Sequence, residues 1–193
     1  GSGKRPTEFT LHDVLIKIKI AFKRQLITHW LFNPDYYLSQ REMAFADGRV
    51  VPWAPHTDPY LDFLINGDLN NIRPHWLFCP TAYARLNGGL EKRHSFFRHF
   101  VKFGQFEEFR TSALFDPEFY RIMNPSMQLQ VSNGDYTSLL ESFCRHGYVY
   151  DVQFSPDFDL GFYKLANPDV VPDGSHVLSV SHHFLRFGVD EGR

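Results

Sequence analysis

The sequence predicts an all-α protein, built as an array of about four helix-turn-helix repeats with a capping helix at its N-terminal end. One landmark is an aromatic residue five positions after a phenylalanine. A second is the pattern Phe-x-x-x-Gly. Each occurs four times, at intervals of about 40 residues that are typical of stacked helical repeats. The predicted structural anchors are Phe32, Tyr37, Phe78, Tyr83, Phe115, Tyr120, Phe158 and Tyr163, together with Gly67, Gly104, Gly147 and Gly188.

The first predicted element is a helix over residues 8–30. Leu11, Leu15, Ile18 and Phe22 fall at helical intervals, and lysine and arginine side chains lie elsewhere around it. A repeat array exposes apolar surface at its ends, so we interpret this helix as a cap. An oligomerisation helix and an interfacial membrane helix are the alternatives, and the second would allow peripheral membrane contact. Residues 1–3, Gly-Ser-Gly, are interpreted as an expression scar.

Each repeat is expected to open with a short helix of about two turns that carries its tyrosine inward. Asn33-Pro34 and Asp116-Pro117 place a capping side chain before a proline, which is favourable at the first helical position. The residue before a proline avoids the helical region, so Asn124-Pro125 and Asn167-Pro168 should end such helices. Asn87-Gly88-Gly89 should end the helix of the second unit.

A longer second helix is expected to end each unit. Apolar residues lie three and four positions before each anchor glycine, which is the spacing of a one-faced amphipathic helix. The glycine itself is expected to form a left-handed C-terminal cap. One such unit cannot bury its own apolar face, so neighbouring units must stack.

The predicted repeat domain covers residues 31–193, with units at about 31–75, 76–113, 114–156 and 157–193. The first unit contains a longer insertion from Arg41 to Asp58, which we interpret as an irregular loop around Trp53. The chain stops at Glu191-Gly192-Arg193, where such a unit would pass to another segment, so we expect it to be part of a longer protein.

Composition excludes some classes of function. The formal net charge of −2 argues against a nucleic-acid-binding protein. No stretch is long and apolar enough to predict a transmembrane helix. The two cysteines, Cys79 and Cys144, form neither a disulfide framework nor a CxxC metal or redox motif, and this favours a cytoplasmic location.

The last half of the chain resembles a known repeat family. FDLGFYKLANPDV at 158–170, followed by HHFLRFGVDEGR at 182–193, is similar to the FDxxYYLxxNPDV…HYLxxGxxEGR helical repeat. That repeat accompanies glycosyltransferases of bacterial polysaccharide synthesis, including rhamnan-synthesis proteins. The first two units match only at their anchors, with Cys79 where the pattern has Asp. The resemblance implies an accessory module on the cytoplasmic side, at the inner face of the membrane, and it supplies no catalytic residues.

The residues themselves favour structural over catalytic roles. His99 and His183 precede the helix phenylalanine in two units, a repeated position that suggests structural roles such as hydrogen bonds between helix ends. Asp116 and Asp159 could act as an acid and a base, but helix capping explains both. Adjacent residues such as His182 and His183 point about 100° apart on a helix, which disfavours a shared metal. We therefore expect no catalytic residue, no metal site and no cofactor.

Aromatic side chains are the remaining binding candidates. Trp53, Tyr37, Trp30 and Trp76 are the candidate glycan-stacking residues, although Trp30 and Trp76 occupy equivalent positions that would also suit core packing. The first hypothesis is a non-catalytic module of a polysaccharide glycosyltransferase, which binds glycan or positions the catalytic domain. Its expected partners are the polysaccharide and a glycosyltransferase domain of the same polypeptide. A protein-interaction or oligomerisation scaffold is the alternative, and a small enzyme is the weakest interpretation.

Overall fold

A computed structural model describes residues 28–54, 57–88, 90, 95–174 and 177–192. Across these residues the chain is helical and has no β-strand, only one isolated bridge between His75 and Phe78, so the all-α fold class is confirmed. The scar at 1–3 and most of the predicted N-terminal helix lie outside the described residues, and residues 28–30 are not helical. Below, residues 31–75, 76–113, 114–156 and 157–193 are called the first to fourth segments.

Each segment opens with a helix, and in three of the four a side chain caps its first turn. The four helices are α2 (Pro34–Ala46), α4 (Pro80–Leu86), α6 (Pro117–Met123) and α10 (Leu160–Ala166). Asn33 accepts a hydrogen bond from the Tyr36 amide at 2.8 Å, and Asp116 and Asp159 accept equivalent bonds at 2.9 and 2.8 Å. Each satisfies a backbone donor that the first helical turn leaves free.

Asparagine ends three of these helices, as predicted. The Asn87 side-chain amide donates to the Tyr83 carbonyl at 2.7 Å and to the Arg110 carbonyl at 2.8 Å. Asn124 and Asn167 donate to the tyrosine carbonyl four residues earlier in the same way. The first segment has no asparagine there, and α2 continues to Ala46, so part of the predicted insertion is helical. An unpredicted helix, α7 (Pro125–Ser132), follows α6 directly.

The second helix of each segment begins as α-helix and widens into one π-helical turn that ends at the anchor glycine. The α-helical parts are α3 (Pro59–Asp62), α5 (Phe96–His99), α8 (Leu139–Ser142) and α11 (Val180–His183). The π-turns are η1 (Phe63–Gly67), η3 (Phe100–Gly104), η4 (Phe143–Gly147) and η5 (Phe184–Gly188). Three continue into a last short turn, η2 (Asp68–Asn70), α9 (Tyr148–Tyr150) and α12 (Val189–Glu191).

The prediction that the anchor glycines form left-handed caps is wrong. Gly67 has φ −64° and lies within the helix. The left-handed residue comes four positions later in every segment, at Asn71, Glu108, Asp151 and Gly192. The glycines serve close packing instead, because a Cβ on Gly67 would lie 2.7 Å from Tyr37 Oη. A Cβ on Gly104 or Gly188 would overlap the hydroxyl of Tyr83 or Tyr163.

The core is aromatic, and carboxylates link one segment to the next. All eight aromatic anchors are at most 7 % exposed. Asp68 accepts a hydrogen bond from the Phe97 amide at 3.1 Å, Glu108 from Leu139 at 2.9 Å and Asp151 from Ser181 at 2.8 Å. Each carboxylate thus satisfies the first turn of the following segment's second helix.

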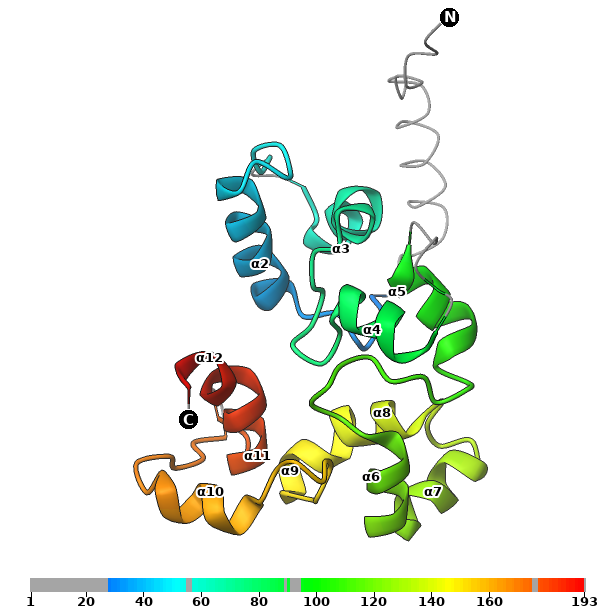
Figure 1. The fold of residues 1–193 in the computed structure, drawn as a ribbon, viewed down its shortest axis with the longest axis vertical. Helices are drawn as coiled ribbons and strands as arrows, with labels where there is room; N and C mark the ends of the chain where they lie inside the picture. The colour runs from blue at the N-terminus through cyan, green and yellow to red at the C-terminus, as the bar shows by residue number, and fades with distance from the viewer. Residues whose placement is uncertain (1–27, 55–56, 89, 91–94, 175–176, 193) are drawn as a thin grey trace, which may run out of the picture.

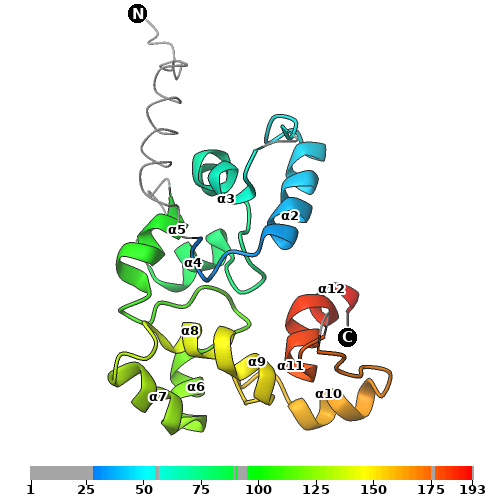
Figure 2. The same cartoon turned by 180° about the vertical axis from the view of Figure 1, so that it is seen from behind.

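The chain bends so that its last segment approaches its first. Figures 1 and 2 show α11 and α12 turning back toward α2, with α9 beside α11. Side-chain contacts confirm this approach, since the Arg186 guanidinium lies 5.2 Å from the Tyr36 ring centroid. Among the helices of the described ranges, none is both long and apolar enough to cross a bilayer.

Candidate functional site

The tetrapeptide His-Trp-Leu-Phe occurs twice, at residues 29–32 and 75–78, and forms a turn that leads into each of the first two segments. His29 Nδ1 accepts a hydrogen bond from the Leu31 amide, and His75 Nδ1 accepts one from Leu77, both at 3.1 Å. In the corresponding turns of the last two segments, Ser112 Oγ accepts a hydrogen bond from the Leu114 amide and Ser155 Oγ accepts one from the Asp157 amide. A side-chain acceptor three residues before each anchor phenylalanine therefore shapes all four turns.

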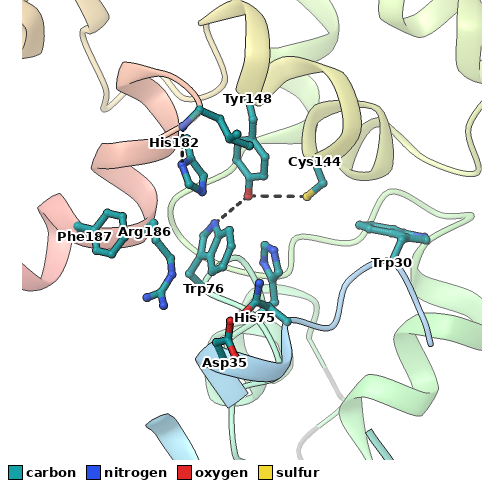
Figure 3. A pocket seen from close by; sticks show the side chains of 11 residues that line it. Trp30, Asp35, His75, Trp76, Cys144, Tyr148, His182, Arg186 and Phe187 are labelled. Atoms are coloured by element: carbon teal, nitrogen blue, oxygen red, sulfur yellow. Dashed lines mark hydrogen bonds between the residues drawn. The ribbon is translucent and has the colours of Figure 1, made fainter. Parts of the chain in front are cut away.

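The second of these turns fixes Trp76. Its ring stacks on His75 with centroids 3.9 Å apart and is only 7 % exposed. The indole Nε1–H donates to Tyr148 Oη at 2.8 Å, a bond that joins the second segment to the third (Figure 3). His182 of α11 packs edge-on against both rings, with centroids 5.7 Å from Trp76 and 5.3 Å from Tyr148.

These contacts enclose one side of a cavity of about 400 Å³ to which all four segments contribute. Figure 3 shows Trp30 at one end and Arg186 with Phe187 at the other, and Trp76 and His75 between them. The lining side chains are Trp30, Asn33, Asp35, His75, Trp76, Cys144, Tyr148, Leu178, His182, Arg186 and Phe187. The volume is within the range of about 300–1,000 Å³ that small-ligand sites occupy.

Arg186 supplies the positive charge of the cavity. Its guanidinium lies 5.2 Å from the centroid of Trp76, 5.2 Å from that of Tyr36 and 5.0 Å from that of Phe187. Such contacts between a cation and aromatic faces stabilise the charge and hold the side chain in place. Asp35, an exposed residue of the first turn of α2, supplies the carboxylate.

The other ionisable groups of the cavity are uncharged at neutral pH. Burial lowers the pKa of His75 to about 3 and that of His182 to about 4, and nearby arginines add to both effects. Burial raises the pKa of the Cys144 thiol to about 12. These histidines are weak bases and this thiol is not a thiolate, so none of the three is prepared to act as a general base or a nucleophile at neutral pH.

No protein-family model, curated protein or solved structure matches this chain. Its function must therefore be argued from the cavity itself.

The cavity contains two of the four predicted aromatic candidates. Trp30 is half-buried and Trp76 is buried, and both line the cavity. Each side chain therefore packs against the core and also forms part of the cavity wall. Trp53 lies elsewhere, half-buried, with the Arg41 guanidinium 5.2 Å from its ring. Tyr37 is fully buried and has no ring face for a sugar, so its candidacy for glycan contact is corrected to a core role.

Sequence analysis missed Arg186, Tyr148 and His182 as cavity residues. They come from the third and fourth segments, and only the bend of the chain brings them to Trp76. The one available signal was that His182 and Arg186 are four residues apart, on one face of a helix.

The remaining chemical candidates have structural contacts. His99 Nδ1 lies 2.8 Å from Tyr83 Oη and His183 Nδ1 lies 3.0 Å from Tyr163 Oη, so both histidines have structural hydrogen bonds, made to the buried anchor tyrosines rather than between helix ends. Asp116 and Asp159 cap α6 and α10. Within the part of the chain that the structure describes, no three His, Cys, Asp or Glu side chains are grouped so as to hold a metal ion.

Proposed function

We propose that this chain is a glycan-binding module without catalytic activity of its own, built from four stacked helix-turn-helix repeats and working beside a bacterial polysaccharide glycosyltransferase. The observation that carries the binding function is the cavity, in which Trp30 and Phe187 have half-buried rings and Trp76 and Tyr148 form a buried wall. The N-terminal helix caps the array in this proposal. The transferase partner, its place in the same polypeptide and the cytoplasmic face of the membrane rest on the sequence resemblance alone.

The lining suits a saccharide for two reasons. The C–H faces of a sugar ring are apolar and pack well against flat aromatic rings, which bury a large area at a small cost in side-chain entropy. Sugar hydroxyls need both hydrogen-bond donors and acceptors. The Arg186 guanidinium can donate to them, and the Asp35 carboxylate can accept from them. The lining thus combines aromatic rings with charged, amide and imidazole groups, and both kinds of group are needed to bind a sugar ring and its hydroxyls.

Titration with oligosaccharides of the source organism's surface polysaccharide tests this function. Two of the three tryptophans line the cavity, so both tryptophan fluorescence and NMR chemical shifts should report binding. We expect Trp30→Leu to weaken binding at least about tenfold, as loss of a stacking aromatic usually does. Trp53→Leu is the matched control, because Trp53 lies outside the cavity. Loss of binding in the Trp53 variant alone would place the site at the loop instead.

A protein-interaction scaffold is the second candidate, and one surface favours it. Phe162 and Leu165 of α10 are 70 % and 84 % exposed, and Val171 after this helix is 71 % exposed. Clustered exposed apolar side chains are typical of interaction surfaces. Sedimentation across a concentration series distinguishes the two functions, since Leu165→Glu should abolish self-association on this surface and leave sugar binding unchanged.

A further inference from the structure

We propose that the glycan bound in the cavity is acidic, and that Arg186 binds its carboxylate through the edge of the guanidinium group. This inference rests on the proposed glycan-binding function and specifies the class of saccharide.

The first argument is that Arg186 lacks the carboxylate partner that five of the nine described arginines have. Arginines that lie within 4.0 Å of a carboxylate are Arg41, Arg49, Arg110, Arg121 and Arg145. Across the described residues, no carboxylate lies that close to Arg186, although it is half-buried and Asp35 lines the same cavity. A half-buried guanidinium with no anion retains the capacity to bind one.

The geometry of the guanidinium leaves its hydrogen-bond donors free. The ring centroids of Trp76, Tyr36 and Phe187 all lie within 5.2 Å of the guanidinium carbon of Arg186. The N–H donors of arginine point outward in the plane of the group, in the fork that matches the two oxygens of a carboxylate. The aromatic rings hold Arg186 in place, and among the described residues its N–H donors form no hydrogen bond or ion pair. Figure 3 shows the side chain beside Trp76 at the cavity.

A second arginine strengthens the positive potential at this end. The Arg73 guanidinium lies 5.6 Å from the same Tyr36 ring, and its Nη2 donates to the Trp76 carbonyl at 2.6 Å. Its buried Nε atom has no hydrogen-bond partner. The facing histidines, His75 and His182, are neutral because burial lowers the pKa of each, so they contribute hydrogen bonds rather than charge.

A pair of disaccharides that differ in one group tests this inference. Cellobiouronic acid carries a carboxylate where cellobiose carries a hydroxymethyl group. We expect the intact chain to bind the acid at least about tenfold more tightly at low salt, as measured by calorimetry and tryptophan fluorescence, because a charge-assisted bond contributes more than a neutral one. The preference should decrease as salt is added.

Arg186→Met should remove the preference for the acid, because methionine keeps an unbranched apolar chain against the rings and loses the charge. Arg121→Met is the matched control, since Arg121 pairs with Glu118 on the surface, away from the cavity. If Arg186→Met does not fold, as judged by circular dichroism, Arg186→Lys replaces it. Lysine keeps the charge but loses the paired donors, so the preference should fall severalfold.

The outcomes separate the inference from the function on which it rests. Equal affinity of the intact chain for the two disaccharides overturns the inference and leaves glycan binding intact. An undiminished preference for the acid in Arg186→Met, or in Arg186→Lys where the methionine variant does not fold, has the same meaning. Absence of binding by both disaccharides and by the organism's own surface oligosaccharides, at millimolar concentration to the folded chain, overturns the function and the inference together.

Discussion

The first and fourth segments build the same joint from different chemistry. In both, the anchor tyrosine hydroxyl contacts the side chain that directly precedes the helix phenylalanine. Tyr37 Oη donates to Asp62 Oδ2 at 2.5 Å, whereas Tyr163 Oη lies 3.0 Å from His183 Nδ1. The position requires a hydrogen-bonding atom that can reach the buried hydroxyl, and a carboxylate and an imidazole both meet that requirement.

A second difference compensates for the charge of Asp62. Arg41 stands four residues after Tyr37, at the place where Asn167 follows Tyr163. Arg41 Nε donates to Asp62 Oδ2 at 2.7 Å, and both side chains are at most 5 % exposed. Asn167 instead closes its helix by bonding the Tyr163 carbonyl at 3.0 Å. In the first segment the position that ends the helix in the fourth segment is occupied by Arg41, which pairs with buried Asp62. No asparagine therefore ends α2 at this point, and the helix continues to Ala46.

The largest expected effect on stability comes from replacing Arg41 with asparagine, the residue found at the equivalent position of the fourth segment. Arg41→Asn leaves the Asp62 carboxylate buried without its cation. Removal of one partner from a buried ion pair usually costs about 3–5 kcal/mol of unfolding free energy, because the remaining charge loses its compensation. Urea denaturation at pH 7 measures this loss as a lower midpoint with an unchanged slope.

The double variant Arg41→Asn/Asp62→His completes the conversion and should recover most of that stability. It would recreate the tyrosine–imidazole pair seen between Tyr163 and His183. If the double variant is as unstable as Arg41→Asn alone, then the joint depends on more than the two side chains, and the proposed equivalence of the segments is wrong at this site.

The local parts of this architecture could be predicted from the sequence. Capping by Asn33 and Asp116, the stop at Asn124 and the buried anchors depend on interactions over a few residues, which spacing reveals. The exchange of Asn for Arg41 could not be interpreted in advance, because its partner Asp62 is 21 residues away.

The π-turns and the cavity could not be predicted for different reasons. Nothing in Phe-x-x-x-Gly distinguishes a widened turn from a left-handed cap until the tyrosine hydroxyl is placed against the glycine, as at Gly188 and Tyr163. The cavity depends on the bend that brings Arg186 to Trp76, and a bend is the sum of all interfaces between segments. Helical periodicity describes single helices and contains no such information.

An intermediate effect is expected at the anchor glycines. Gly188→Ala places a methyl group against the Tyr163 hydroxyl, and overpacking of this kind usually costs about 1–3 kcal/mol. Tyr163→Phe removes that hydroxyl, so we expect the double variant Gly188→Ala/Tyr163→Phe to lose less than the two single losses combined. Thermal and urea unfolding of the four proteins in this cycle measure the coupling.

The first segment should behave differently in the same cycle. A Cβ on Gly67 would lie 2.8 Å from a ring carbon of Tyr37 and 2.8 Å from one of Phe63, as well as near the hydroxyl. Loss of the hydroxyl does not relieve the ring overlaps, so Tyr37→Phe should not rescue Gly67→Ala. Equal rescue in both segments would show that the rings of Tyr37 and Phe63 move away from an added methyl group and that only the hydroxyl contact requires a glycine at position 67.

The smallest expected effect concerns the turns that lead into the two segments. His29 shapes the first and Ser155 the fourth. Burial lowers the pKa of His29 to about 4, against an opposing hydrogen bond from Gln105. Between pH 7.5 and 5 the unfolded chain protonates this histidine and the folded chain does not, so its contribution makes stability fall as the pH falls. The expected loss is about 1–2 kcal/mol over that interval.

His29→Ser converts the turn to the chemistry of the fourth segment and should flatten the pH dependence by that amount, whatever the variant loses in ring packing. Urea denaturation at pH 7.5 and at pH 5 gives the difference directly. Ser155→Ala is the matched control, because it removes the acceptor of the Asp157 amide from the same turn and titrates nothing. Its loss of stability should be equal at the two pH values. An unchanged pH dependence in His29→Ser would mean that His29 is protonated in the folded chain, and then its Nδ1 could not accept the Leu31 amide on which the turn depends.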